Sequence, residues 1–267
     1  MKLSVLTPWK DRSELAETLE RNEPLLRRDD VELLLVNGGG DADALERLVR
    51  GHGWTGIRLL RLGGATEFNK SECLNLGAAR ARGECLFVLD ADVAPAPDFL
   101  EQALAEVRAE HCFVSIERIT ESAPEKVPGR WDPNSEIACN AVRREITSRA
   151  GRTATVEFRM ASDGSRTGPG MIVVRRDHFF EVQGFNSRLT GWGFEDYDLQ
   201  IRLQLLLGLQ RKTLGAAVHL THERTAQEES NARNRELCFA NYKRGLFLGS
   251  LGADVERWRG SLSETTL

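Results

Sequence analysis

In the first 110 residues, short apolar runs alternate with segments whose apolar residues recur at helical spacing. Each run has the length of a buried strand, and glycine or asparagine follows several of them. Such strand–helix alternation predicts a mostly parallel sheet flanked by helices, which is an α/β fold. Asp11 or Ser13 is expected to cap the first helix. The predicted strands are 3–7, 31–36, 57–62 and 85–89, and the predicted helices are 13–26, 43–51, 70–82 and 97–109.

The pattern changes after residue 113. Residues 117–168 are polar and contain several prolines, so we expect an irregular stretch with at most a helix at 136–150. Regular patterns resume beyond it. The predicted strands of this half are 113–116 and 170–174, and its predicted helices are 176–182, 195–207 and 228–249.

Composition limits the class of protein. The chain has 267 residues, of which 41% are hydrophobic and 28% charged, and this is ordinary for one large or two small globular domains. A net charge of -4 gives no sign of a nucleic-acid partner.

Five cysteines, an odd number without C-x-x-C spacing, indicate reduced and mostly buried thiols. The N-terminal apolar stretch is too short for a signal peptide, and no run reaches the ~18 apolar residues of a membrane helix. We therefore expect a cytoplasmic protein without a transmembrane segment, free in solution or peripheral at the inner membrane face.

Candidate ligand-binding residues follow three of the predicted strands. In open α/β sheets, ligands bind beyond the carboxyl ends of the strands. This rule places residues 7–12, 37–40 and 90–92 on one rim, where their polar and glycine-rich sequences predict a nucleotide pocket.

Asp90 and Asp92 end an apolar strand and are separated by one alanine. Two carboxylates at a sheet edge suit Mg²⁺ or Mn²⁺ bound together with a diphosphate. A solvated turn of the same sequence is the alternative, because the Asp-x-Asp pattern is short and common.

Two later segments also carry candidate chemistry. Trp192 lies between two glycines and is followed by Glu195, Asp196 and Asp198 in the first turn of a helix, where carboxylates also fit the helix dipole without any function. An exposed aromatic ring beside carboxylates is suited to gripping a sugar. Downstream, one histidine of His219-Leu-Thr-His222 can complete a metal site, although buried histidines are often structural.

Taken in order, these segments resemble glycosyltransferases of the GT-A fold. Residues 1–12 look like the nucleotide-binding first strand and turn of that fold. Residues 68–77 are similar to the Phe-Asn-Arg-x-x-x-Leu-Asn-x-Gly segment of β-1,4-galactosyltransferases, and residues 191–198 to their Gly-Trp-Gly-Gly-Glu-Asp-Asp-Asp motif. Bacterial chondroitin-type polymerases and polypeptide N-acetylgalactosaminyltransferases share related versions. The resemblance covers about residues 3–225, with no match over 117–168.

The resemblance implies a role for each matching residue. Asp196 would be the general base, and Glu195 would hold a sugar beside it. Mn²⁺ or Mg²⁺ would be bound by Asp92, assisted by Asp90, and by His219 or His222.

Donor binding is implied for a further set of residues. Trp192 and Gly193 would belong to a loop that closes over the donor. The residues expected near the nucleotide and its sugar, besides Asp90, are Thr7, Pro8, Trp9, Arg12, Asn37, Asn69 and Lys70.

The sequence departs from the resemblance in three places. Phe194 replaces the second glycine of the Gly-Trp-Gly-Gly motif. Residues 37–40 stand where such enzymes often place an aspartate for uracil, and we expect no membrane anchor of the kind that the Golgi members have.

The resulting expectation is a single GT-A domain over 1–267, with a nucleotide-binding half (1–112), an acceptor and metal half (113–225) and a helical tail (226–267). It would be an inverting, metal-dependent glycosyltransferase that moves a hexose or N-acetylhexosamine from UDP-Gal, UDP-GalNAc or UDP-GlcNAc. The acceptor would be a carbohydrate, a lipid-linked sugar, a peptide or a small molecule. The alternatives are a retaining transferase, a sugar-nucleotide nucleotidyltransferase and a non-catalytic sugar-binding module.

Overall fold

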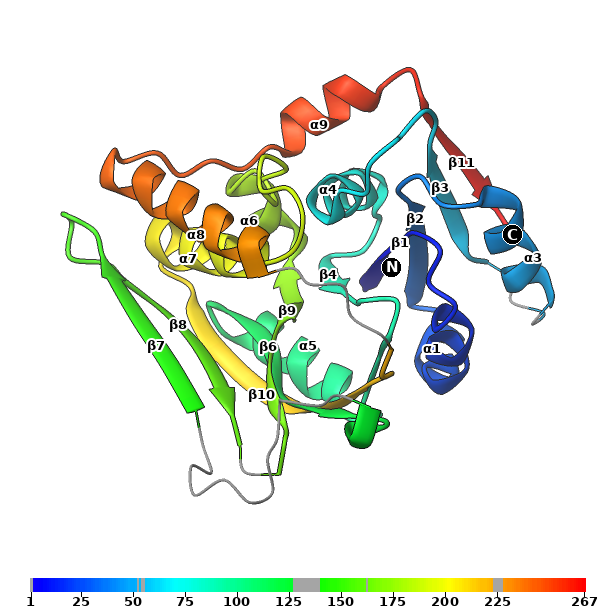
Figure 1. Ribbon diagram of the computed structural model, residues 1–267, viewed down its shortest axis with the longest axis horizontal. Coiled ribbons are helices and arrows are strands. Elements are labelled where there is room, and N and C mark those ends of the chain that lie inside the picture. Colours follow the sequence, from blue (N-terminus) through cyan, green and yellow to red (C-terminus); the bar gives the residue numbers. More distant parts are fainter. Residues whose placement is uncertain (1, 52, 54–55, 127–139, 162, 223–227) are drawn as a thin grey trace.

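A computed structural model describes residues 2–51, 53, 56–126, 140–161, 163–222 and 228–267. Its centre is one eleven-stranded sheet with helices on both faces (Figure 1). The strands are β1 (Leu3–Trp9), β2 (Val31–Asn37), β3 (Arg58–Leu62), β4 (Cys85–Val88), β5 (Val93–Pro95), β6 (Cys112–Glu121), β7 (Asn140–Thr147), β8 (Thr153–Met160), β9 (Arg166–Arg175), β10 (Gln210–His219) and β11 (Leu262–Thr266).

Nine α-helices and one short 3-10 turn (Pro124–Lys126) connect these strands in the described part of the chain. The helices are α1 (Leu15–Arg21), α2 (Glu23–Leu26), α3 (Ala42–Gly51), α4 (Lys70–Arg80), α5 (Phe99–Ala109), α6 (Arg176–Glu181), α7 (Glu195–Leu207), α8 (Glu228–Lys243) and α9 (Leu251–Trp258).

The strand order is β11-β3-β2-β1-β4-β9-β6-β10-β5, with β8 joined to β9 and β7 to β8. Strands β3, β2, β1 and β4 are parallel neighbours, as the sequence predicts, and β6 is parallel to β10. Strand β9 runs antiparallel to both β4 and β6, so it joins two parallel groups into one mixed sheet. The predicted α/β class is confirmed, with parallel pairing concentrated in the N-terminal half.

The sheet separates two apolar layers. Alternate residues of one strand enter different layers, as Leu33 and Leu35 do on one face and Leu34 and Val36 on the other. Helices α1, α3 and α5 supply the first layer, whereas α4, α6, α7 and α9 supply the second. Because both faces are covered, the ends of the strands are left for ligands.

The first predicted helix is wrong in its extent and its cap. It is divided into α1 and α2 at Asn22, and α1 starts without a side-chain cap. Asp11 has a φ of 54°, and its carboxylate accepts a hydrogen bond from the backbone N–H of Asp41. Asp11 therefore joins the loops after β1 and β2 instead of capping a helix.

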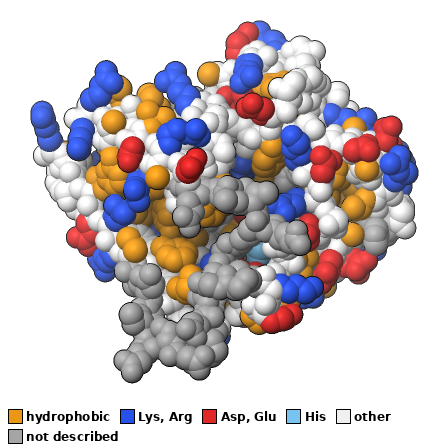
Figure 2. All heavy atoms as spheres, viewed as in Figure 1, with side chains coloured by type: hydrophobic (Ala, Val, Ile, Leu, Met, Phe, Trp, Pro, Cys, Tyr) orange, Lys and Arg blue, Asp and Glu red, His pale blue; other side chains and the backbone are white. Residues whose placement is uncertain are grey.

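The predicted irregular stretch of 117–168 is also wrong. Strand β6 continues to Glu121, and the antiparallel strands β7 and β8 form a long hairpin at the left of Figure 1. The helix predicted at 136–150 is a strand from Asn140 to Thr147, and 136–139 lie outside the described residues. Figure 2 shows apolar side chains gathered over this side of the molecule.

The C-terminal region contains more than the single helix predicted over 228–249. Helix α8 ends at Lys243, α9 packs on α4, and β11 adds an antiparallel edge strand to β3. A buried hydrogen bond of 2.7 Å from Asn75 Nδ2 to Asp254 Oδ2 joins α4 to α9. In the described residues, no helix is long and apolar enough to cross a membrane. Four cysteines are free and buried, and the fifth, Cys139, lies outside the described residues.

Candidate active site

Asp92 and two histidines meet where β4 and β10 end. The chain leaves β4, passes Asp90 and Asp92 in a turn, and forms β5, which pairs with the end of β10 so that Val93 faces His219. The backbone N–H of Leu220 donates to the Asp92 carbonyl at 2.7 Å. This pairing brings the Asp-x-Asp turn to the histidine segment, although about 130 residues separate them in sequence.

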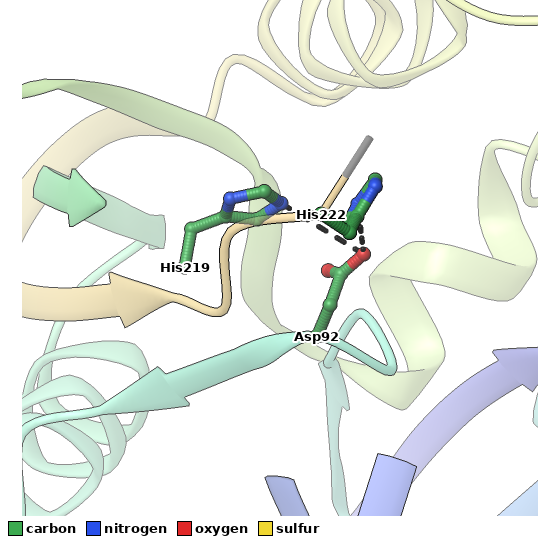
Figure 3. A group of neighbouring side chains, drawn as sticks. All are labelled: Asp92, His219 and His222. Atoms are coloured by element: carbon green, nitrogen blue, oxygen red, sulfur yellow. Dashed lines mark hydrogen bonds and ion pairs between the residues drawn. The ribbon is translucent and has the colours of Figure 1, made fainter. Parts of the chain in front are cut away.

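The three side chains point toward one another (Figure 3). Asp92 Oδ2 lies 3.1 Å from His222 Nε2 and 3.8 Å from His219 Nε2. One ligand atom from each residue lies within 4.8 Å of the others. A carboxylate oxygen with two imidazole nitrogens is a donor set that suits Mn²⁺ and related divalent ions, so these residues fit a metal.

Charged neighbours hold this group from both sides. Arg12 Nη1 lies 2.9 Å from His222 Nδ1, and Glu121 Oε2 lies 2.6 Å from His219 Nδ1. Burial disfavours ionisation of Asp92, but the hydrogen bond from His222 and the charges of His219, His222 and Arg12 outweigh it and lower the pKa of Asp92. Asp92 is therefore held as a carboxylate, the form that binds a cation.

Lys70 lies between Asp90 and the acids of α7. It is the first residue of α4, a helix whose N-cap is the side chain of Asn69. Lys70 Nζ is 2.9 Å from Asp90 Oδ1, 3.7 Å from Asp196 Oδ1 and 3.8 Å from Glu195 Oε1. Burial opposes the charge on Lys70, but the three carboxylates outweigh it and raise its pKa. One ammonium thus faces three carboxylates.

Asp196 has a raised pKa. Burial raises its pKa to about 7, and the nearby charges of Glu195 and Asp90 add to the rise, while Lys70 opposes it. Its Oδ1 is buried and has no hydrogen-bond partner in the described part of the chain. A carboxyl group of this kind can exchange a proton near neutral pH.

The glycines on either side of Trp192 allow its loop to lie against α8. Gly191 and Gly193 have φ values of 79° and 100°, and a Cβ on either would collide with Ser230 or Asn231 at 2.8 Å. The Ser230 hydroxyl donates to the Trp192 carbonyl and accepts from its N–H. The Trp192 side chain remains exposed, so it is available to a ligand.

Phe194, which stands where the resembling motif has a glycine, has a left-handed backbone with φ at 72°. Its ring is buried and contacts the rings of Tyr197 and Phe239, with centroids 5.8 and 5.9 Å apart. Phe194 thereby joins α7 to α8 at the point where the Trp192 loop ends.

Several residues predicted to bind the donor have other contacts. Trp9 is 4% exposed and its Nε1 donates to the Arg12 carbonyl, while the Asn37 side chain accepts from Gly39 and Gly40. Buried Thr7 and Pro8 form the end of β1, and Asn69 Nδ2 donates to the Ser187 carbonyl.

Asp90 lies outside the group of three that could hold a metal. The residues that do converge are Lys70, Asp90, Glu195 and Asp196 on one side and Arg12, Asp92, His219 and His222 on the other.

Two residues at the site are absent from the sequence-based prediction. Gly170 on β9 lies so close to Asp196 that a Cβ would be 2.7 Å from Oδ2. Glu121 contacts His219 from the end of β6. Gly170 had a sequence signal, because the Gly-Pro-Gly of 168–170 interrupts a strand pattern. No sequence signal pointed to Glu121, because the predicted strand ended at residue 116.

A protein-family model for glycosyl transferase family 2 matches residues 4–177. The chain belongs to this family. A second model, described as the N-terminal domain of galactosyltransferase, matches residues 151–223, which contain the Trp192 loop and both histidines. The predicted family resemblance is confirmed.

Similar proteins agree with this assignment. β-1,4-Galactosyltransferase 4 of Rattus norvegicus and that of Homo sapiens are each 22% identical over 244 residues, covering 88% of this chain. The match covers 53% of those relatives, so the chain spans about half of their length.

Two solved structures share the fold. S. aureus TarS in complex with UDP-GlcNAc has a TM-score of 0.57 at 15% identity, with 89% of this chain and 65% of that chain covered. Mannosyltransferase PcManGT from Pyrobaculum calidifontis, in complex with GDP-Man and Mn²⁺, has a TM-score of 0.57 at 17% identity, with 91% and 64% covered. The GT-A fold class is therefore shown.

Proposed function

We propose that this protein is an inverting, metal-dependent glycosyltransferase that moves a hexose or N-acetylhexosamine from a UDP-sugar to an acceptor hydroxyl. The observation that carries the proposal is the position of Lys70. Its ammonium contacts Asp90, two residues from Asp92 of the proposed metal site, and also Asp196, the proposed base. Through Asp90, Lys70 thus links the proposed cation site for the leaving diphosphate to the proposed proton acceptor for the incoming hydroxyl.

Asp92, His219 and His222 would hold the divalent cation, Mn²⁺ or Mg²⁺. A bound cation offsets the negative charge that develops on the diphosphate as it leaves. Arg12 and Lys70 add fixed positive charge beside the same place. These charges support binding of a nucleotide diphosphate, as do the donors named in the two structural neighbours, UDP-GlcNAc and GDP-Man.

Asp196 would take the proton of the acceptor hydroxyl on Oδ1, which has no hydrogen-bond partner among the described residues. The acceptor oxygen then forms a bond to the anomeric carbon while the bond from that carbon to the diphosphate oxygen breaks. One displacement inverts the anomeric centre. Glu195, buried beside Asp196, would hold a sugar hydroxyl, and exposed Trp192 would cover the donor and exclude water.

The domain organisation is proposed as one unit, with the donor bound by residues 1–112 and the acceptor by 113–225. The metal would take Asp92 from the first half and His219 and His222 from the second. The hairpin β7–β8 supports this division. Its residues Val142, Arg144, Val156 and Phe158 line a small cavity of about 50 Å³ together with Phe194 and Tyr197, and Tyr197 follows the proposed base in the sequence. Such a surface suits an acceptor that presents an apolar face of a sugar or of its aglycone.

A donor screen tests the proposal. The purified chain would be incubated with Mn²⁺ and each of UDP-Gal, UDP-GalNAc, UDP-GlcNAc and GDP-Man, and release of the nucleoside diphosphate would be measured with and without sugar acceptors. We expect Mn²⁺-dependent UDP release that an acceptor accelerates and Asp92→Ala abolishes. Specific binding without turnover would support the non-catalytic alternative. Formation of UTP and a sugar 1-phosphate in a parallel incubation with added pyrophosphate would support the nucleotidyltransferase.

A further inference from the structure

Glu121 contacts the proposed metal site from the sheet side. It is the last residue of β6, as His219 is of β10, and the two are register partners in this parallel pair. Their side chains therefore leave the sheet on the same face, and Glu121 Oε2 lies 2.6 Å from His219 Nδ1. Both side chains are buried, with 7% and 8% of their surface exposed.

The surroundings of Glu121 keep it as a hydrogen-bond acceptor. Arg166 Nε lies 3.7 Å from its Oε1, and the Thr221 hydroxyl donates to its Oε2 at 3.2 Å. A carboxylate with these partners accepts a hydrogen bond from the Nδ1–H of His219. The proton of the neutral ring then sits on Nδ1, and the lone pair of Nε2 faces Asp92 at 3.8 Å.

His222 is held in a different way. Its Nδ1 faces Arg12 Nη1, and a guanidinium can only donate hydrogen bonds, so this nitrogen is the acceptor. The neutral ring therefore carries its proton on Nε2, toward Asp92. Of the two histidines, His219 has the ligand nitrogen already directed at the site, and Glu121 is the residue that directs it.

We propose that Glu121 is a positioning residue of the metal site, which fixes the orientation and tautomer of His219 and strengthens binding of the divalent cation. This inference rests on the proposed function only in taking Asp92 and His219 as ligands of the cation. A purely structural role is the alternative, in which Glu121 helps to hold β6 against β10. The backbone pairing of these strands extends from Cys112 to Glu121 and already provides that contact.

The two roles predict different effects. Removal of such an outer partner of a metal-binding histidine costs about 10–100-fold in metal affinity. Glu121→Ala leaves His219 Nδ1 without its acceptor and should weaken Mn²⁺ binding by this amount. Glu121→Gln keeps an acceptor oxygen without the charge and should fall between Glu121→Ala and the wild type.

Glu32 provides a matched control. It is also a buried glutamate on a central strand, and it is also paired with an arginine, Arg58 Nη1 lying 2.7 Å from its Oε2. It also accepts hydrogen bonds from Ser4 Oγ and the Arg82 N–H. Glu32→Gln should lower the melting temperature and leave the Mn²⁺ affinity unchanged.

The experiment titrates the full chain with Mn²⁺ alone and follows the free ion by electron paramagnetic resonance, with no donor or turnover involved. Wild type, Asp92→Ala, Glu121→Ala, Glu121→Gln and Glu32→Gln are compared, and the melting temperature of each is measured without metal. Weaker binding in the order wild type, Glu121→Gln, Glu121→Ala supports the inference. If Glu121→Ala does not fold, Glu121→Gln alone decides by the same measurement.

Two results overturn the inference and are distinguishable. Equal Mn²⁺ affinity in the wild type and the Glu121 variants removes the positioning role and leaves the metal site and the proposed function intact. Failure of the wild type to bind Mn²⁺ through Asp92 removes the metal site itself, and the inference with it.

Discussion

Asp196 lies against the backbone of Gly170, and a Cβ on Gly170 would be 2.7 Å from the Asp196 Oδ2. Gly170 of strand β9 therefore limits the position of the proposed base on one side, while Lys70 of α4 contacts its carboxylate. The position of this carboxyl group depends on three segments that are far apart in sequence, namely β9, α4 and the start of α7.

Gly170→Ala should reduce turnover more than stability. The added methyl group has to displace the Asp196 carboxyl group. A displacement of about 1 Å at a catalytic group can cost about 100-fold in rate. Steady-state kcat, with donor KM measured in parallel, tests this. Gly51→Ala is the control, because a Cβ there has no neighbour within 4 Å. Equal kcat in both variants would exclude a positional requirement at β9.

The pH profile of kcat/KM should reflect the ionisation of Asp196. A base whose pKa is about 7 is protonated and inactive below that pH, so activity should rise with pH and level off above about 7. Asp90, Glu195 and Lys70 are the charged groups that face it. Lys70→Met removes the charge that lowers the pKa, and it should move the rising limb to higher pH. A limb near pH 4 in the wild type would contradict the assignment.

Ionisation of Asp196 should also lower the thermal stability of the folded protein. The pKa of Asp196 is raised from an ordinary value of 3.8 to about 7 in the folded state. Its ionisation therefore destabilises the fold progressively as pH rises through this window, and fully above about 7. Asp196→Asn should raise the melting temperature at pH 8, with a smaller gain as pH falls and none near pH 4. A melting temperature at pH 8 equal to or below that of the wild type would contradict this prediction.

Phe194→Gly should destabilise the protein in spite of relieving its left-handed backbone. Relief of a non-glycine residue with positive φ gains about 1–2 kcal/mol, whereas loss of a buried phenylalanine costs about 3–5 kcal/mol. The contacts with Tyr197 and Phe239 therefore dominate, and the net loss should be about 1–4 kcal/mol in urea unfolding. Increased stability would show that the aromatic contacts contribute little.

The regular N-terminal half could be predicted from sequence because its signals are local. Strand β2 contains the continuous apolar run of residues 33–36, and the bounds of α7 follow from the acids at Glu195 and the glycine at 208. The sequence could indicate that one of the two histidines completes the metal site, but not how Asp92 approaches them, because that approach depends on the pairing of β5 with β10.

The hairpin β7–β8 could not be predicted in the same way. Strand β7 carries alternating charges such as Arg143 and Glu145, which pair with each other on an exposed face and resemble a polar loop. Its few apolar residues lie against α7 and the Phe194 turn, so their pattern has meaning only in the folded protein. Contacts such as Glu121 with His219 also require knowledge of strand register, which no single segment contains.

The central claim is that Asp196 removes the proton of the acceptor while the cation site serves the leaving group. The most direct measurement is the kcat of Asp196→Asn at pH 8 with saturating Mn²⁺, donor and acceptor. Loss of general-base catalysis predicts a decrease of about 100–10,000-fold, with the Mn²⁺ affinity unchanged. Turnover within a few-fold of the wild type would contradict the account.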